Sequence, residues 1–116
     1  SELADEAQLF TAQAWALEKR PDEAQRAFQA LLDRRPRPDV AARALEGQAH
    51  LAAQDGRFER AIELYALALP GHPSPDTIRT AIEKVRERRD RSRTVKPGDR
   101  AAALDHHLRK EVREKP

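Results

Sequence analysis

The sequence contains no cysteine and no methionine, and its 116 residues include one tryptophan, one tyrosine and three phenylalanines. The absence of cysteine excludes disulfide bonds, thiolate zinc sites and cysteine nucleophiles. No apolar stretch is long enough to span a bilayer, so we expect no membrane insertion. The opening SELADEAQ lacks the basic and hydrophobic regions of a secretory signal. We therefore expect a soluble chain, either cytoplasmic or periplasmic, and the missing initiator methionine suggests a processed protein or a piece of a longer one.

Charged residues and alanine are what the sequence has in quantity. Charged residues make up 36% and hydrophobic residues 39% of the chain, a balance that favours closely packed helices over a sheet. A chain of this length has room for one domain. The net charge of +2 is unevenly distributed along the chain. Residues 1–74 include nine basic and twelve acidic residues, whereas residues 75–116 include thirteen basic and eight acidic residues. The basic C-terminal third is suited to contact nucleic acid or an acidic partner.

Proline, glycine and helical hydrophobic spacing divide the first two thirds of the chain into four predicted helices. Pro21 suits the first turn of the second helix, where its missing N–H is not needed, and Gly56 ends the third helix as a left-handed cap. The predicted helices start near Leu3, Pro21, Asp39 and Phe58. Their apolar patterns are Ala7, Phe10, Ala14 and Leu17 in the first; Ala24, Ala27, Phe28, Leu31 and Leu32 in the second; Ala41, Leu45, Ala49 and Ala52 in the third; and Phe58, Ala61, Ile62, Tyr65, Ala68 and Leu69 in the fourth.

The second and fourth helices repeat one pattern. Four pairs of similar residues lie 37 positions apart: Ala24 and Ala61, Phe28 and Tyr65, Leu32 and Leu69, and Pro36 and Pro73. A constant offset predicts two helical hairpins in tandem. The small residue lets two helices approach closely, and the aromatic residue one turn later fills the space between hairpins. We therefore expect Phe28 and Tyr65 to be buried, and Trp15 to lie in the core between the first two helices.

The stretch GRFERAIELYALALPGHP and, less closely, RPDEAQRAFQALLDRRP resemble the second half of the tetratricopeptide repeat. That repeat is a helix pair of about 34 residues. Its second helix has a small residue, an aromatic residue four positions later and a closing proline. The resemblance covers about residues 5–75. The first helix of each hairpin departs from the family, which usually has tryptophan, leucine and glycine there. In this sequence the corresponding positions are Gln8, Thr11 and Ala12 in the first hairpin, and Leu45, Gln48 and Ala49 in the second. The extra residues predict a longer link between hairpins or an earlier start of the third helix.

The resemblance implies an all-α fold, a right-handed α-solenoid of two hairpins with a capping helix and a C-terminal helix. The expected parts are hairpins at 3–38 and 39–74, a capping helix at 75–92, a linker at 93–98 and a C-terminal helix at 99–114. The capping helix has an apolar stripe of Ile78, Ala81, Ile82 and Val85 and a polar outer side, as a solenoid end requires. The C-terminal helix has a thin stripe of Ala101, Leu104, Leu108 and Val112. It is suited to dock on the capping helix, to form a homodimer, or to begin another repeat.

The sequence offers no pattern of catalytic chemistry. It has no glycine-rich phosphate loop and no serine in a nucleophile elbow. His106 and His107 are adjacent and would lie about 100° apart on a helix, which does not suit them to bind one metal ion together. We expect no enzyme activity, no cofactor, no metal and no small-molecule substrate.

The favoured function is a non-catalytic scaffold that binds a peptide or helix of a partner protein. Members of the resembled family commonly do so on a concave face lined by the first helix of each hairpin. The corresponding partner-binding positions are Gln13, Arg43, Glu46, His50 and Gln54, with Lys84 and Arg88 from the capping helix. The alternative is contact with nucleic acid or an acidic partner through the basic C-terminal third. No aromatic residue interleaves the arginines of RERRDRSR, which argues against base stacking.

Overall fold

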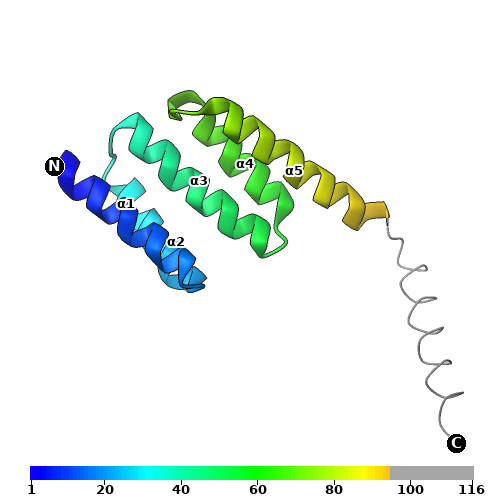
Figure 1. Cartoon of the computed structure of the whole chain (residues 1–116), viewed down its shortest axis with the longest axis horizontal. Coiled ribbons are helices and arrows are strands. Elements are labelled where there is room, and N and C mark those ends of the chain that lie inside the picture. Colours follow the sequence, from blue (N-terminus) through cyan, green and yellow to red (C-terminus); the bar gives the residue numbers. More distant parts are fainter. Residues whose placement is uncertain (95–116) are drawn as a thin grey trace, which may run out of the picture.

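The computed structural model describes residues 1–94, and these residues form an all-helical array. The elements are α1 (Glu2–Leu17), α2 (Pro21–Asp33), α3 (Pro38–Gln54), α4 (Phe58–Ala68), the short 3₁₀-helix η1 (Leu69–Gly71) and α5 (Pro75–Thr94). Consecutive α-helices pack against each other, and α1 also contacts α3 (Figure 1). α5 includes the first two residues of the predicted linker. The rest of the linker and the predicted C-terminal helix at 99–114 lie outside the described residues.

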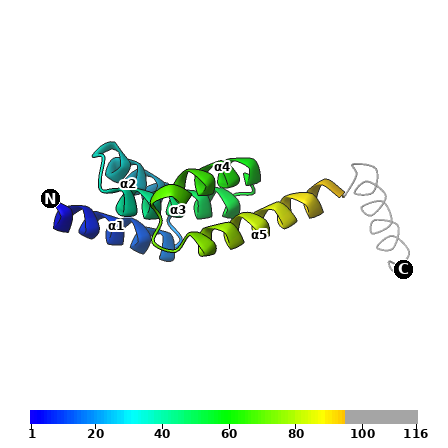
Figure 2. The same ribbon diagram turned by 90° about the horizontal axis from the view of Figure 1, so that it is seen from above.

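The helices form two layers. Figure 2 shows α2 and α4 on one side of the array, with α1 and α5 on the other. The link from α2 to α3 is residues 34–37, and α3 starts at Pro38, one residue earlier than expected. Within residues 1–94, no helix is long and apolar enough to cross a membrane.

Both hairpins close with the same backbone turn. Lys19 after α1 has a φ of 59°, and Gly56 after α3 has a φ of 78°, so both are left-handed. In each turn the following N–H donates to the carbonyl five residues earlier, at 3.0 Å in the first hairpin and 2.9 Å in the second. This Schellman arrangement satisfies a carbonyl at the end of the helix. The predicted left-handed cap at Gly56 is confirmed, and the repeat of 37 residues extends to the backbone, since Lys19 lies 37 positions before Gly56.

α3 lies between two hydrophobic clusters. One cluster joins α1, α2 and α3 and contains Phe28, while the other joins α3, α4 and α5 and contains Tyr65. The exposed fractions of Phe28 and Tyr65 are 1% and 5%, which confirms that the repeated aromatic residues are buried. Trp15 packs half-buried against the first cluster. In α5, the predicted stripe is confirmed, because Ile78, Ile82 and Val85 are buried in the second cluster.

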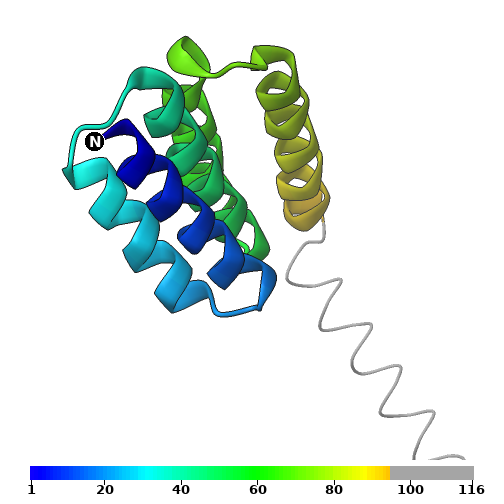
Figure 3. The ribbon, with the colours of Figure 1, turned by 60° about the vertical axis from the view of Figure 1, so that its left-hand side comes forward.

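The apolar pattern of α1 does not face the core. All four of its members are exposed: Ala7, Phe10, Ala14 and Leu17. The buried side of α1 is instead formed by Leu9 and Ala12. α1 is thus apolar on two faces, and helical spacing alone does not decide which face the neighbouring helices cover. Figure 3 turns the α1–α2 hairpin forward, and no described helix lies in front of α1 in that view.

Candidate binding groove

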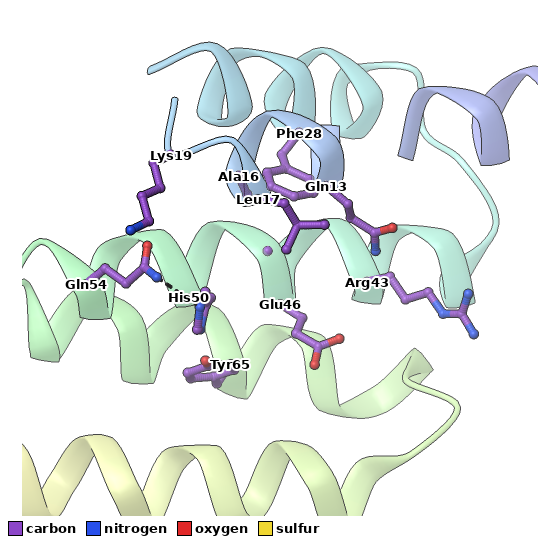
Figure 4. A pocket seen from close by; sticks show the side chains of 11 residues that line it. Gln13, Ala16, Leu17, Lys19, Phe28, Arg43, Glu46, His50, Gln54 and Tyr65 are labelled. Carbon is purple, nitrogen blue, oxygen red and sulfur yellow. Dashed lines mark hydrogen bonds between the residues drawn. The ribbon is translucent and has the colours of Figure 1, made fainter. Parts of the chain in front are cut away.

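A groove with a volume of about 600 Å³ lies between α1 and α3. Five of the predicted partner-binding residues line it: Gln13 from α1, and Arg43, Glu46, His50 and Gln54 from α3 (Figure 4). Lys84 and Arg88 were predicted to join them, but they lie on α5 and do not line this groove. The structure therefore brings together the predicted residues of the two hairpins and leaves those of the capping helix apart.

The polar wall of the groove is one face of α3. Arg43, Glu46, His50 and Gln54 are spaced by three, four and four residues, which aligns them along the helix. At the helical rise of 1.5 Å per residue, this row is about 16 Å long. An extended peptide covers about 3.3 Å per residue, so the row matches about five residues of such a peptide.

The floor of the groove is apolar and close to the backbone of α3. It includes Ala16, Leu17, Phe28, Gly47 and Tyr65. Gly47 lies against the ring of Phe28, because a Cβ atom added to Gly47 would lie 2.6 Å from Phe28 Cε1 and Cε2 and still closer to Cζ. The aromatic ring therefore packs on bare helix backbone. The missing side chain at Gly47 thus makes room for the ring of Phe28.

Glu46 is held in place from outside α3. Its Oε1 is 2.7 Å from Nε2 of His72, whose side chain is 6% exposed. The backbone N–H of Ser74 donates to Nδ1 of His72 at 2.9 Å, so Nε2 is the nitrogen that donates its proton to Glu46. His72 follows η1, which approaches α3 closely at Gly71, where a Cβ atom would lie 2.6 Å from the backbone oxygen of Pro38. The loop after α4 thus fixes the orientation of a carboxylate in the groove.

Tyr65 connects the second core cluster with the groove. Burial raises the pKa of its hydroxyl, and the negative charge of Glu46 raises it further. The phenol therefore stays protonated in the folded protein, where it presents a neutral polar group beside Glu46. On the other side, Nε2 of His50 lies 3.2 Å from Nε2 of Gln54, which links two polar residues of the α3 row.

Two cationic side chains of the groove have no acidic partner among residues 1–94. They are Lys19, at the turn after α1, and Arg43, near the start of α3. Figure 4 places them toward opposite ends of the groove. Most other arginines of this part of the chain are paired, as Arg37 is with Glu2, Glu6 and Asp39. The groove therefore holds two cations that form no ion pair within residues 1–94, beside the single carboxylate of Glu46.

The arginines of α5 are arranged differently. Arg86 pairs with Glu83 at 2.7 Å, and Arg89 and Arg93 both pair with Glu59 of α4. Arg88 lies over the ring of Phe58, with its Cζ atom 5.1 Å from the ring centroid. Much of the positive charge in the described part of the basic run is thus satisfied within the protein.

Four residues of the groove and its support were not predicted from the sequence. Lys19, Leu17 and Gly47 line the groove, and His72 holds Glu46 in place. A signal for Lys19 was present, because it lies 37 positions before the turn glycine Gly56. His72 was not predictable, because its contact with Glu46 joins residues 26 positions apart across two helices. Within residues 1–94, no group of three or more histidine or acidic side chains is placed to hold a metal ion.

Comparison with protein-family models, with curated proteins and with solved structures gives no match for this chain.

Proposed function

We propose that the protein is a non-catalytic interaction module in which tetratricopeptide-like hairpins form a right-handed α-solenoid. Its ligand is a short extended segment of a partner protein, bound between α1 and α3. The observation that carries this proposal is the convergence of five residues, expected at partner-binding positions, on one groove with an apolar floor. Tandem hairpins of this kind commonly present such a face to peptides.

The chemistry of the groove defines the kind of peptide. The floor around Leu17 and Gly47 suits one apolar side chain, which would be removed from water there. Lys19 and Arg43 suit carboxylates on either side of it, since an arginine binds a carboxylate through two parallel hydrogen bonds. We therefore propose an acidic peptide of about five residues with a central apolar anchor.

The alternative, nucleic acid bound through the basic C-terminal third, receives less support from α5. Glu59, Glu83 and Asp90 engage its arginines, and phosphate binding would have to replace those ion pairs. Phosphate contacts need available cations, and in α5 Arg79, Arg86, Arg89 and Arg93 are paired with carboxylates, whereas Lys84 and Arg88 have no acidic partner among residues 1–94.

Selection from a random peptide library on the immobilised protein tests the proposal. We expect the selected sequences to share an apolar residue flanked by aspartate or glutamate. Fluorescence polarisation with a labelled selected peptide then measures affinity. Arg43→Glu should weaken binding by about tenfold or more, because it removes a charge-assisted hydrogen bond and adds a like charge.

The matched control is Lys84→Glu, which makes the same change of charge at an exposed helical position outside the groove. Binding to this variant should stay close to that of the unaltered protein. Equal losses in both variants would mean that the peptide responds to overall charge, and a library that yields no common sequence would contradict the proposal itself.

A further inference from the structure

Three of the four large hydrophobic side chains that are exposed in the described residues lie on α1. Leu3 is 77%, Phe10 64% and Leu17 85% exposed. They recur every seven residues, with the exposed Ala7 and Ala14 between them. Together these five residues form the outer stripe of α1. A single exposed leucine is ordinary, whereas a continuous stripe along a helix marks an interface.

The outer stripe lies opposite the side of α1 that packs in the core. Leu9 and Ala12, which are buried, lie on the other side of the helix. A helix that is apolar on both sides is typical of a position between two neighbours, and an end helix of a solenoid needs a polar outer face. α5 has such a face, with exposed Arg79, Glu83 and Arg86, but α1 does not.

The order of residues in the stripe indicates what covers it. Leu3 and Leu17 are both seven residues from Phe10, and the two alanines lie on either side of Phe10. The stripe therefore reads nearly the same in both directions. When two copies pair antiparallel, Phe10 meets Phe10, Leu3 meets Leu17, and the alanines let the two helices approach closely. A surface that matches itself in this way is what a twofold dimer requires.

The dipole of α1 favours the same orientation. Antiparallel pairing opposes the dipoles of the two helices, whereas parallel pairing aligns them. The side-chain charges at the ends of α1 add little, because Glu2 and Glu6 pair with Arg37, and Arg20 pairs with Glu23, within one copy. We infer that the outer stripe of α1 is a homodimer interface in which two copies of α1 pack antiparallel about Phe10.

The dimer is expected to be weak. α1 has 16 residues and is about 24 Å long, so one helix pair buries less surface than most stable dimers do. Sedimentation velocity over a concentration series tests the proposal. We expect a dimer that dissociates on dilution, and Phe10→Glu should weaken it by about tenfold or more, because a charge would be buried against its own copy. Phe10 does not line the groove, but Leu17 belongs both to the groove and to the outer stripe, so the peptide and the second copy should compete for it. The Phe10→Glu variant should therefore bind the peptide at least as tightly as the unaltered protein.

Two matched controls keep the test specific. Leu67→Glu places the same charge at the fourth exposed hydrophobic residue, on α4 and away from the stripe, and should leave the dimer intact. Leu108→Glu tests the predicted C-terminal helix, the other candidate for self-association, and should also leave it intact. A chain that stays monomeric at all concentrations, a dimer unaffected by Phe10→Glu, or a dimer lost in Leu108→Glu would overturn the inference.

Cysteine cross-linking tests the orientation, and the absence of natural cysteine makes it free of background. Leu3→Cys should not form a disulfide with its own copy, but a mixture of Leu3→Cys and Leu17→Cys chains should form the mixed disulfide. This follows because a disulfide requires Cα atoms within about 7 Å. A Leu3→Cys disulfide between identical chains would show parallel pairing and overturn the antiparallel arrangement.

Discussion

Gly47→Ala should destabilise the protein, although alanine is the better helix former. Gly47 lies inside α3, where its Cα faces the ring of Phe28. An added Cβ atom would lie 2.6 Å from Cε1 and Cε2 of that ring, which is far inside van der Waals contact. Phe28 is 1% exposed and packs in the first cluster, so moving its ring disturbs that cluster. The methyl group therefore has to displace the ring or separate α2 from α3.

The size of the effect follows from two opposing contributions. Replacing glycine by alanine in a helix interior stabilises by about 1 kcal/mol. Overpacking a core typically costs about 1–3 kcal/mol, and the rigid ring places this site toward the upper end. The free energy of unfolding should thus fall by about 1–2 kcal/mol, which lowers the melting temperature of a chain this size by roughly 5–10 °C.

Urea and thermal unfolding, followed by circular dichroism, measure this change. The matched test is the same substitution in a Phe28→Leu background, where the shorter side chain removes the overlapping atoms. There Gly47→Ala should be neutral or stabilising, so the double-mutant cycle should show strong coupling between the two positions. If Gly47→Ala alone raised the free energy of unfolding by about 1 kcal/mol, helix propensity would explain the whole effect, and the contact between Gly47 and Phe28 would be refuted.

Three further predictions concern the hairpin turn and the second cluster. Lys19→Gly should raise the free energy of unfolding by about 1 kcal/mol, because Lys19 has a left-handed φ of 59°, and Gly56→Ala should lower it for the same reason; chemical denaturation checks both. Stability should fall as the pH rises above about 10, because burial and Glu46 raise the pKa of Tyr65 and the unfolded phenol loses its proton first; Tyr65→Phe should remove this part of the pH dependence in unfolding measured by circular dichroism. Tyr65→Ala should cost about 3 kcal/mol, and an unchanged melting temperature would contradict its role in packing α4 against its neighbours.

The hairpins were predictable from sequence because their key residues act locally. The pairs Ala24–Phe28 and Ala61–Tyr65 each lie one turn apart, so a single helix shows the small and the aromatic residue together. Gly56 marks its own turn, because glycine adopts a left-handed φ without strain. The buried stripe of α5 follows from helical spacing in the same way.

The face of α1 was not predictable because both of its faces satisfy the helical spacing. Choosing Leu9 over Phe10 as the core residue requires the positions of α2 and α3, which a single helix does not contain. The groove has the same limitation. Alignment located its polar residues on α3, but the support of Glu46 by His72 and the packing of Phe28 on Gly47 depend on how helices distant in sequence meet.

The position of the groove follows from the role of α3 in both clusters. Contacts with α1, α2 and α4 bury residues around most of its circumference, so only a narrow face remains for polar side chains. Arg43, His50 and Gln54 lie on that face and are exposed. Substituting them removes groove chemistry with little effect on packing, since exposed positions typically change stability by less than about 0.5 kcal/mol. Substituting the buried residues of α3 disturbs both clusters at once. Binding and stability are therefore separable along this one helix, which makes α3 the element on which the proposed function is tested most directly.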